Sequence, residues 1–348
     1  MIRVLVAEDS AVTREYLVYL LCQDPALEVI GVARDGLEAV QQAERLRPDV
    51  IVMDVHMPRM DGYEATRQIM ARAPTPIVIV SASSSRQEVA ATLDALKAGA
   101  LTVLDKPAGP DHSAHEESAR RLVETVKLMA EVKVVRRWPR RGSSERPAPA
   151  AVSVGQKIQL IAMAASTGGP PVVSEILGQL PRDLAVPVLL VQHIAPGFTE
   201  GLVEWLARET PLTVKLAAAG ESVASGTVYI APDGFQMGIT TRGQIRLVKE
   251  PTGNSFCPSA SHLFESVAEA YGPTAVGVLL TGMGRDGADG LLRLRQAGGV
   301  TIAQDERSSA IFGMPAEAIR LGAAASVLAP EDIARAIRSL VSGGHRYV

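Results

Sequence analysis

The feature that most constrains the fold is an alternation of short apolar runs with longer segments of helical periodicity. Each apolar run in the first 107 residues is short enough for a buried strand. The segments between them repeat apolar residues three and four positions apart, as amphipathic helices do. This alternation predicts a parallel, doubly wound α/β sheet. The runs are IRVLVA, LEVIGVA, DVIVMD, PIVIVSAS and ALTVLDKP, and the helical segments are 13–23, 36–46, 61–73, 86–99 and 116–132.

The same alternation returns in the second half of the chain. The runs IQLIAMAAS, PVLLVQH and AVGVLLTG are accompanied by helical segments near 172–179, 198–208 and 287–298. Three further runs, TVYIAPDG, FQMGITT and QIRLVKE, have the length and the turn residues of an antiparallel meander. We therefore predict two α/β domains, each with a doubly wound parallel sheet, the second with an antiparallel piece.

Composition changes between the two patterned regions. The stretch RRWPRRGSSERPAPAAVSVG is rich in Arg, Pro, Ser and Ala and has no apolar periodicity. We predict domains at 1–131 and 156–348, joined by a flexible basic linker at 132–155. A solvated tether is favoured over a nucleic-acid site because no DNA-binding helical unit accompanies the arginines. Residues 155–348 hold 15 basic and 17 acidic side chains, which also disfavours a DNA-binding output domain.

Cysteine content and the start of the chain indicate the compartment. Cys22 and Cys257 are the only cysteines, too few for a disulfide framework, and no CxxC pair is present to bind zinc. The opening MIRVLVAEDS has an acidic pair where a signal peptide needs its apolar stretch, and no window reaches about 18 uninterrupted apolar residues. We expect a cytoplasmic protein that does not insert into membranes.

Charged and polar residues end the predicted strands of the first domain. Glu8 and Asp9 end the first strand, Asp54 the third, Ser81 the fourth and Lys106 follows the fifth. Because the carboxyl ends of parallel strands form one edge, these side chains should converge. Clustered carboxylates need a cation, and oxygen ligands select a hard ion such as Mg²⁺. Beside that ion Asp54 can be phosphorylated, with the lysine and the hydroxyl group stabilising the phosphoryl oxygens.

These residues, with the MPRMDG that follows Asp54, resemble the receiver domain of response regulators over about residues 1–131. The resemblance implies a flavodoxin-like fold and a histidine kinase as phosphoryl donor. Val103 departs from the family pattern, because receivers usually carry a switch aromatic residue at this position. The implied roles are phospho-acceptor for Asp54, metal ligands for Glu8, Asp9, Asp54 and the backbone carbonyl of His56, and switch pair for Ser81 and Lys106.

A serine, a histidine and an aspartate follow predicted strands of the second domain. Ser166 lies in AASTGGP, His193 in QHIAPGF and Asp286 in TGMGRDG. A serine hydroxyl needs an imidazole to take its proton, and the imidazole needs a carboxylate to fix its tautomer. Asp233 and Asp305 are alternative orienting acids, but the glycines around Asp286 favour close approach. AASTGG is also a possible phosphate loop, although it lacks GxGxxG and GK[ST].

The chain order Ser, His, Asp and the residue Ala164 in place of the first glycine of GxSxG disfavour an ordinary α/β-hydrolase. Residues 155–345 resemble the catalytic domain of chemotaxis protein-glutamate methylesterases, through ITTRGQIRLV, LLTGMGRDGADGL, AQDERSSAIFGMP and LGAAASVLAPEDIARAI. The resemblance implies a Rossmann-like fold with Ser166 as nucleophile, His193 as base and then acid, and Asp286 as orienter. Thr167 and Met283 are the implied oxyanion contributors. Cys257 departs from the family, which often has a basic residue there.

The same resemblance implies the reaction and the partners. The expected activity is hydrolysis of glutamate methyl esters on chemoreceptors with release of methanol, with no metal in that step, and glutamine deamidation on the same receptors. It further implies a monomer whose unphosphorylated receiver blocks the catalytic face. A non-catalytic response regulator, with the three residues serving only as caps and turns, is the main alternative.

Overall fold

A computed structural model describes residues 1–81, 86–132, 134, 157–249 and 257–343. The chain divides into two compact units, Met1–Ser143 and Ser144–Val348. Nearly all of the predicted linker at 132–155 lies outside the described residues, so its flexibility stays a prediction.

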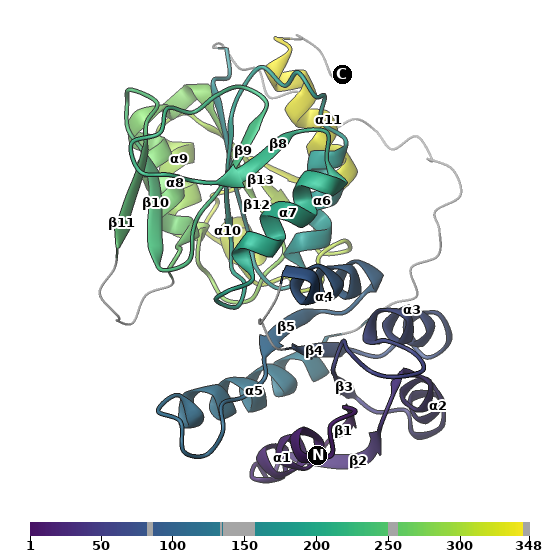
Figure 1. Ribbon diagram of the computed structural model, residues 1–348. Coiled ribbons are helices and arrows are strands. Elements are labelled where there is room, and N and C mark those ends of the chain that lie inside the picture. The colour runs from purple at the N-terminus through teal and green to yellow at the C-terminus, as the bar shows by residue number, and fades with distance from the viewer. Residues whose placement is uncertain (82–85, 133, 135–156, 250–256, 344–348) are drawn as a thin grey trace. The chain divides into compact units, whose positions relative to one another are not determined.

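The first unit is built on a five-stranded parallel sheet with the order β2-β1-β3-β4-β5 (Figure 1). This is the flavodoxin-like order, in which the direction of strand addition across the sheet reverses between β1 and β3. All five predicted strands are present. Their bounds are β1 (Ile2–Ala7), β2 (Leu27–Ala33), β3 (Val50–Met53), β4 (Ile77–Ser81) and β5 (Thr102–Asp105).

Helices cover both faces of this sheet, which explains why β3 and β4 are buried at every position and are apolar except for Ser81 at the end of β4. α1 packs beside α5, whereas α2, α3 and α4 form the other layer. Asp35 and Asp61 begin α2 and α3 by accepting a backbone N–H three residues on, at 2.9 and 2.8 Å. The helices are α1 (Ala11–Cys22), α2 (Gly36–Leu46), α3 (Gly62–Arg72), α4 (Arg86–Ala98) and α5 (His115–Ala130).

The second unit contains a seven-stranded sheet in the order β14-β13-β12-β6-β7-β9-β8, and every pair in it is parallel. From β6 the chain builds outward through β7 and then crosses back to β12 on the other side. The switch point therefore lies between β6 and β12. The strands are β6 (Leu160–Ala165), β7 (Val188–Gln192), β8 (Thr213–Leu216), β9 (Thr227–Ile230), β12 (Ala275–Leu279), β13 (Val300–Gln304) and β14 (Ser326–Leu328).

The antiparallel piece is present but smaller than the expected meander. β10 (Phe235–Ile239) and β11 (Ile245–Lys249) form a two-stranded antiparallel sheet that packs on α8. The third run, TVYIAPDG, supplies β9 instead, which pairs in parallel with both β7 and β8. All four residues of β9 are buried, so this strand requires neighbours and cover on both sides that a hairpin would not provide.

Two helical layers enclose the seven-stranded sheet. α6, α7 and α11 form one layer, and α8, α9 and α10 form the other. The core contains the fully buried aromatic side chains of Phe198, Trp205 and Phe264. The helices are α6 (Gly169–Gly178), α7 (Thr199–Glu209), α8 (Ala260–Ala270), the 3₁₀ turn Gly272–Thr274, α9 (Ala288–Gln296), α10 (Met314–Arg320) and α11 (Pro330–Val341).

Candidate functional site

Ser166 and His193 directly follow neighbouring strands of the second sheet. β6 and β7 pair in parallel with Ala165 opposite Gln192. Ser166 is therefore the residue that follows β6, and His193 the residue that follows β7. The His193 N–H donates to the Ala165 carbonyl at 2.9 Å. On the other side of β6, the Ser166 N–H donates to the carbonyl of Thr281 at 2.9 Å, just after β12. Ser166 thus lies at the switch point, where open α/β sheets bind ligands.

Asp286 reaches the same place from the loop between β12 and α9. Its Oδ2 lies 3.0 Å from Nε2 of His193, and the two side chains are 8% and 13% exposed. With Nε2 directed at the carboxylate, Nδ1 is the ring nitrogen on the side away from Asp286. The predicted histidine and aspartate are therefore brought together, in a largely dry environment that strengthens their interaction.

The N-terminus of α8 holds the Asp286 carboxylate. Oδ1 accepts hydrogen bonds from the Ser259 hydroxyl at 2.9 Å and the Ser261 N–H at 3.0 Å, and Oδ2 accepts one from the Ala260 N–H at 2.7 Å. Burial alone would raise the pKa of Asp286, but the His193 imidazole and these N–H donors hold its pKa well below the ordinary value. The positive end of the helix dipole favours the same ionised form.

The two alternative orienting acids are engaged elsewhere. Asp233 accepts hydrogen bonds from the Gly197 N–H at 2.8 Å and from the hydroxyl group of Thr199, at the start of α7. Asp305 accepts from the Ser308 N–H at 3.0 Å and from the hydroxyl group of the same serine. Both carboxylates stabilise local turns, which favours Asp286 as the partner of the histidine.

The turn after β6 has an unusual helix start. Ala164, the residue that departs from GxSxG, is buried inside β6, so the turn itself does not depend on it. Gly168 makes the turn with a φ of +72°, and an added Cβ there would lie 2.4 Å from Ala310. Pro170 and Pro171 occupy the first turn of α6 and carry no N–H. The helix therefore offers few donors, which argues against the phosphate-loop alternative.

The loop after β12 lies against Ser166. An added Cβ on Gly282 would lie 2.6 Å from the Ser166 Cβ, so only glycine permits this approach. The hydroxyl of Thr281 lies 3.0 Å from the carbonyl of Thr167 and connects the two loops. Met283 follows on the same loop, with 43% of its surface exposed. Thr167 and Met283 therefore flank Ser166 from two loops, and their contribution to an oxyanion hole stays a prediction.

The first unit brings its predicted acids together. Glu8, Asp9 and Asp54 each offer a carboxylate oxygen, and these oxygens lie within 4.8 Å of one another. Nζ of Lys106 lies 2.9 Å from Glu8 Oε2 and 3.0 Å from Asp54 Oδ2. Asp54 Oδ1 accepts the N–H of Val55 at 2.7 Å. This oxygen-only donor set fits a hard divalent cation such as Mg²⁺.

Ionisation in this cluster follows from burial and from the lysine. Burial raises the pKa of Glu8, and the nearby Asp54 charge adds to the increase, although Lys106 opposes it. Burial would lower the pKa of Lys106, but its two carboxylate partners raise it overall. The lysine is thus kept as a cation beside Asp54.

The remaining predicted residues of the first unit lie around Asp54. Ser81 ends β4 opposite Asp105 in β5 and is 1% exposed. His56 is exposed, two residues after Asp54. Val103 is buried within β5, where the receiver family usually carries an aromatic side chain.

Several supporting residues were not foreseen. Gln192 donates to the carbonyls of both Ser166 and His193. Ser259 bonds to Asp286, and Cys257, which departs from the methylesterase pattern, lies half-buried two residues before it. The only sequence signal for Gln192 was its position at a strand end, directly before a candidate histidine. The serine residue directly precedes α8, as N-caps do.

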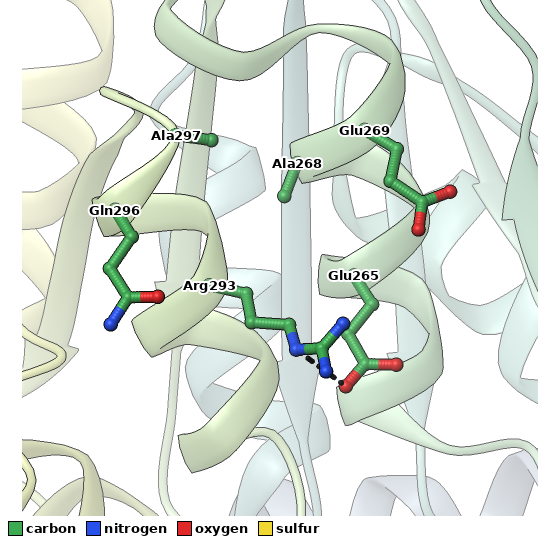
Figure 2. A pocket seen from close by; sticks show the side chains of 6 residues that line it. All are labelled: Glu265, Ala268, Glu269, Arg293, Gln296 and Ala297. Atoms are coloured by element: carbon green, nitrogen blue, oxygen red, sulfur yellow. Dashed lines mark ion pairs between the residues drawn. The ribbon is translucent and has the colours of Figure 1, made fainter.

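A hollow between α8 and α9 lies apart from these residues (Figure 2). The Arg293 guanidinium spans it, with Nε 3.5 Å from Oε1 of Glu265. Both side chains are exposed, and such ion pairs contribute little. Its lining comprises Glu265, Ala268, Glu269, Arg293, Gln296 and Ala297, none of which belongs to the Ser166 site.

The fold and the sites together define a response regulator in which a receiver-type unit accompanies a second α/β unit with Ser166 and a His193–Asp286 pair at neighbouring strand ends. The family model "Response regulator receiver domain" matches residues 4–115, and "CheB methylesterase" matches residues 161–337. The chain belongs to the CheB methylesterase family, in the form that carries an amino-terminal receiver domain.

Relatives match over nearly the whole chain. The "Protein-glutamate methylesterase/protein-glutamine glutaminase" of Nitrosospira multiformis is 51% identical and covers 98% of each chain. The "Protein-glutamate methylesterase/protein-glutamine glutaminase 4" of Geobacter metallireducens is also 51% identical, over 98% of this chain and 99% of the relative. The solved catalytic domain of Thermotoga maritima CheB methylesterase is 36% identical, covers 53% of this chain and all of that chain, and has a TM-score of 0.51.

The helices of the described residues include none with the length and apolar character needed to span a bilayer.

Proposed function

We propose that this protein is a phosphorylation-regulated protein-glutamate methylesterase that also deamidates glutamine residues in its protein substrates. The observation that carries the proposal is the convergence of Ser166, His193 and Asp286 at the switch point of the second sheet. Full-length relatives of the same name and the two matching family models support it. We propose a receiver domain at 1–131 and a catalytic domain at 156–348.

The proposed reaction begins with attack of the Ser166 hydroxyl oxygen on the ester carbonyl carbon. His193 takes the hydroxyl proton as the C–O bond forms, and then gives it to the departing methoxy oxygen, so methanol leaves. A water molecule then attacks the acyl-serine, again losing its proton to the imidazole. The proton returns to the serine oxygen, and the free glutamate side chain is released.

The other residues of the proposed site act on charge. Asp286, kept ionised by the start of α8, stabilises the imidazolium form of His193 in both steps. The backbone N–H groups of Thr167 and Met283 are the proposed donors to the developing oxyanion. Removing one such donor typically raises the barrier by about 2.7 to 4 kcal/mol.

Deamidation requires the same acyl chemistry. With a glutamine side chain in place of the ester, His193 protonates the leaving nitrogen, and ammonia departs in place of methanol. Water then releases the same glutamate product. Both activities therefore depend on Ser166, which makes one substitution a test of both.

In the receiver, Asp54 is the proposed phospho-acceptor. Its carboxylate oxygen attacks phosphorus, and the bond from phosphorus to the histidine nitrogen of the kinase breaks. Glu8, Asp9, Asp54 and the carbonyl of His56 would hold Mg²⁺, which when bound neutralises the phosphoryl oxygens. Lys106 supplies a second positive charge, and the Ser81 hydroxyl donates a hydrogen bond to one phosphoryl oxygen.

The expected partners follow from this assignment. We propose chemoreceptors carrying methylated glutamates as substrate, a histidine kinase as phosphoryl donor, and a monomeric enzyme acting in the cytoplasm. The proposed regulation is relief of a block when the receiver is phosphorylated, because a phosphoryl group carrying a charge of about −1.5 to −2 can shift a bistable segment.

The experiment is methanol release from methylated receptor fragments. Wild type and Ser166→Ala are compared, each with and without a small-molecule phosphodonor and Mg²⁺. Serine-dependent release that rises with the phosphodonor supports the whole proposal. Serine-dependent release that ignores the phosphodonor removes the regulation, and release that survives Ser166→Ala overturns the assigned nucleophile.

A further inference from the structure

Gln192 is a buried polar residue whose side chain joins two loops of the proposed active site. It ends β7, directly before His193, and is 5% exposed. Its Nε2 donates to the carbonyl of Ser166 at 2.9 Å and to the carbonyl of His193 at 3.0 Å. Both N–H groups of one amide are thus used, one on each loop.

The neighbours of this amide fix its orientation. Both atoms facing Nε2 are carbonyl oxygens, which accept only, so an NH₂ group must point toward them. The other end, Oε1, is buried without a hydrogen-bond partner among the residues that the structure describes. It faces the start of α6, where an added Cβ on Gly169 would lie 2.5 Å away. Pro170 and Pro171 follow and have no N–H to offer it.

The unpartnered oxygen means that packing alone does not explain a glutamine at position 192. A buried polar atom without a partner destabilises the folded state, whereas an apolar side chain of similar length would not. The amide must therefore contribute something that packing does not require. Its NH₂ group supplies the only property that an apolar residue of this shape lacks.

We propose that Gln192 is a positioning residue that holds the Ser166 loop against the His193 loop, so that hydroxyl and imidazole keep a productive geometry. This inference rests on the triad under Proposed function. The backbone bond from His193 to Ala165 joins the strand ends, and the Gln192 amide adds two bonds beyond them. A displacement of about 1 Å in an active site can cost about 100-fold in rate.

The test uses the full-length enzyme, activated with phosphodonor and Mg²⁺, and two substitutions of similar shape. Gln192→Met removes both donors together with the unpartnered oxygen. We expect kcat for methanol release to fall between about 10-fold and 100-fold, with KM changed by less than about two-fold, since the amide holds catalytic groups rather than substrate.

Gln192→Glu provides a readout that a merely structural role would not move. A protonated carboxyl group can donate one hydrogen bond, whereas an ionised one opposes both carbonyls. The kcat of this variant relative to wild type should therefore rise as pH falls, and at its best should lie between those of Gln192→Met and wild type.

Ser266→Ala is the matched control, because the Ser266 hydroxyl oxygen accepts a buried hydrogen bond from the Ile239 N–H at 2.7 Å, away from the three proposed catalytic loops. It should lower the thermal unfolding midpoint and leave kcat unchanged. The inference is overturned if Gln192→Met keeps wild-type kcat, or if the relative kcat of Gln192→Glu does not depend on pH. Activity in Ser166→Ala would instead overturn the triad itself.

Discussion

The two units use the same edge of a parallel sheet in opposite ways. In the receiver unit, the described residues give Asp54 one backbone N–H donor and one lysine contact. In the catalytic unit, Asp286 accepts three donors from the start of α8 besides its contact with His193. A carboxylate with few donors keeps electron pairs for a metal or for phosphorus. One surrounded by donors is held ionised and can orient its neighbour, so the number of donors distinguishes the proposed phospho-acceptor from the proposed orienting acid.

The strongest test of this difference is Asp286→Asn. An amide in this position donates to His193 where the carboxylate accepts, which selects the wrong tautomer for taking the serine proton. We expect kcat for methanol release to fall about 10⁴-fold, by analogy with other triads. Asp289→Asn is the control, since that carboxylate is exposed and paired with Arg285. Comparable losses in the two variants would contradict the assigned role.

The corresponding change in the receiver is Asp54→Asn. The amide cannot form an acyl phosphate, so incorporation of the phosphoryl label should be abolished. Stimulation of methanol release by phosphodonor should disappear as well. Release without phosphodonor should persist, because the catalytic unit keeps its own residues. Mass spectrometry of the phosphoprotein and initial rates check both expectations, and label retained by the variant would place the acceptor elsewhere.

Acid sensitivity should distinguish the supporting carboxylate. The native pKa of Asp286 lies below that of the unfolded chain, so its stabilising effect is complete above about pH 4 and is lost as pH falls toward the native value. Each pKa unit of difference corresponds to about 1.4 kcal/mol. Urea unfolding of the catalytic unit should therefore depend less on pH below 4 in Asp286→Asn than in wild type. Equal pH dependence would refute the depressed pKa.

Removing one helix N-cap in each unit should have smaller effects, which again differ between the units. Ser259→Ala removes both the cap of α8 and a donor to Asp286, so we expect a loss of about 1 kcal/mol in stability together with a several-fold lower kcat. Asp61→Ala removes the cap of α3 and should cost about the same stability without changing unstimulated methanol release. Thermal unfolding and kcat measured on both variants separate the two roles.

The smallest expected effect concerns a partly exposed carboxylate. Arg67 and Gln68 hydrogen bonds lower the pKa of Glu64 to about 2, yet this side chain is solvated and screened. Glu64→Gln should therefore cost no more than about 0.5 kcal/mol. An NMR titration of Glu64 checks the pKa, and a much larger loss of stability would show that donors matter outside buried sites as well.

The fold was predictable where burial on both faces left an uninterrupted apolar run. β3, β4, β6, β7 and β12 were identified for this reason, whereas β1, β2 and β5 each carry an exposed charged residue and were identified as short apolar runs between helical segments. β13 is buried at every position yet was not among the predicted strands. β8 was missed because the four residues Thr213–Leu216 include a lysine and an exposed threonine, a pattern without strong periodicity. β9 was assigned to the wrong sheet, since strand length and turn residues do not reveal which partner a strand chooses.

The sites were predictable as residue types at strand ends but not as networks. Position and chemistry singled out Ser166, His193 and Asp286, and the surrounding glycines already favoured Asp286 over Asp233. The bonds that hold Asp233 in a local turn could not be predicted. Gln192 could not have been singled out, because a glutamine at a strand end has no chemistry that requires it. Its role depends on distances between loops that only the folded chain defines.

The bond between the Ser166 N–H and the Thr281 carbonyl joins residues more than a hundred positions apart. During synthesis the serine leaves the ribosome long before β12, and Asp286 follows later still. A truncated or partly synthesised chain that lacks β12 has no partner for this bond and no carboxylate for the histidine. Esterase competence should therefore arise late in translation, so that an incomplete chain carries the proposed nucleophile without the residues that would activate it.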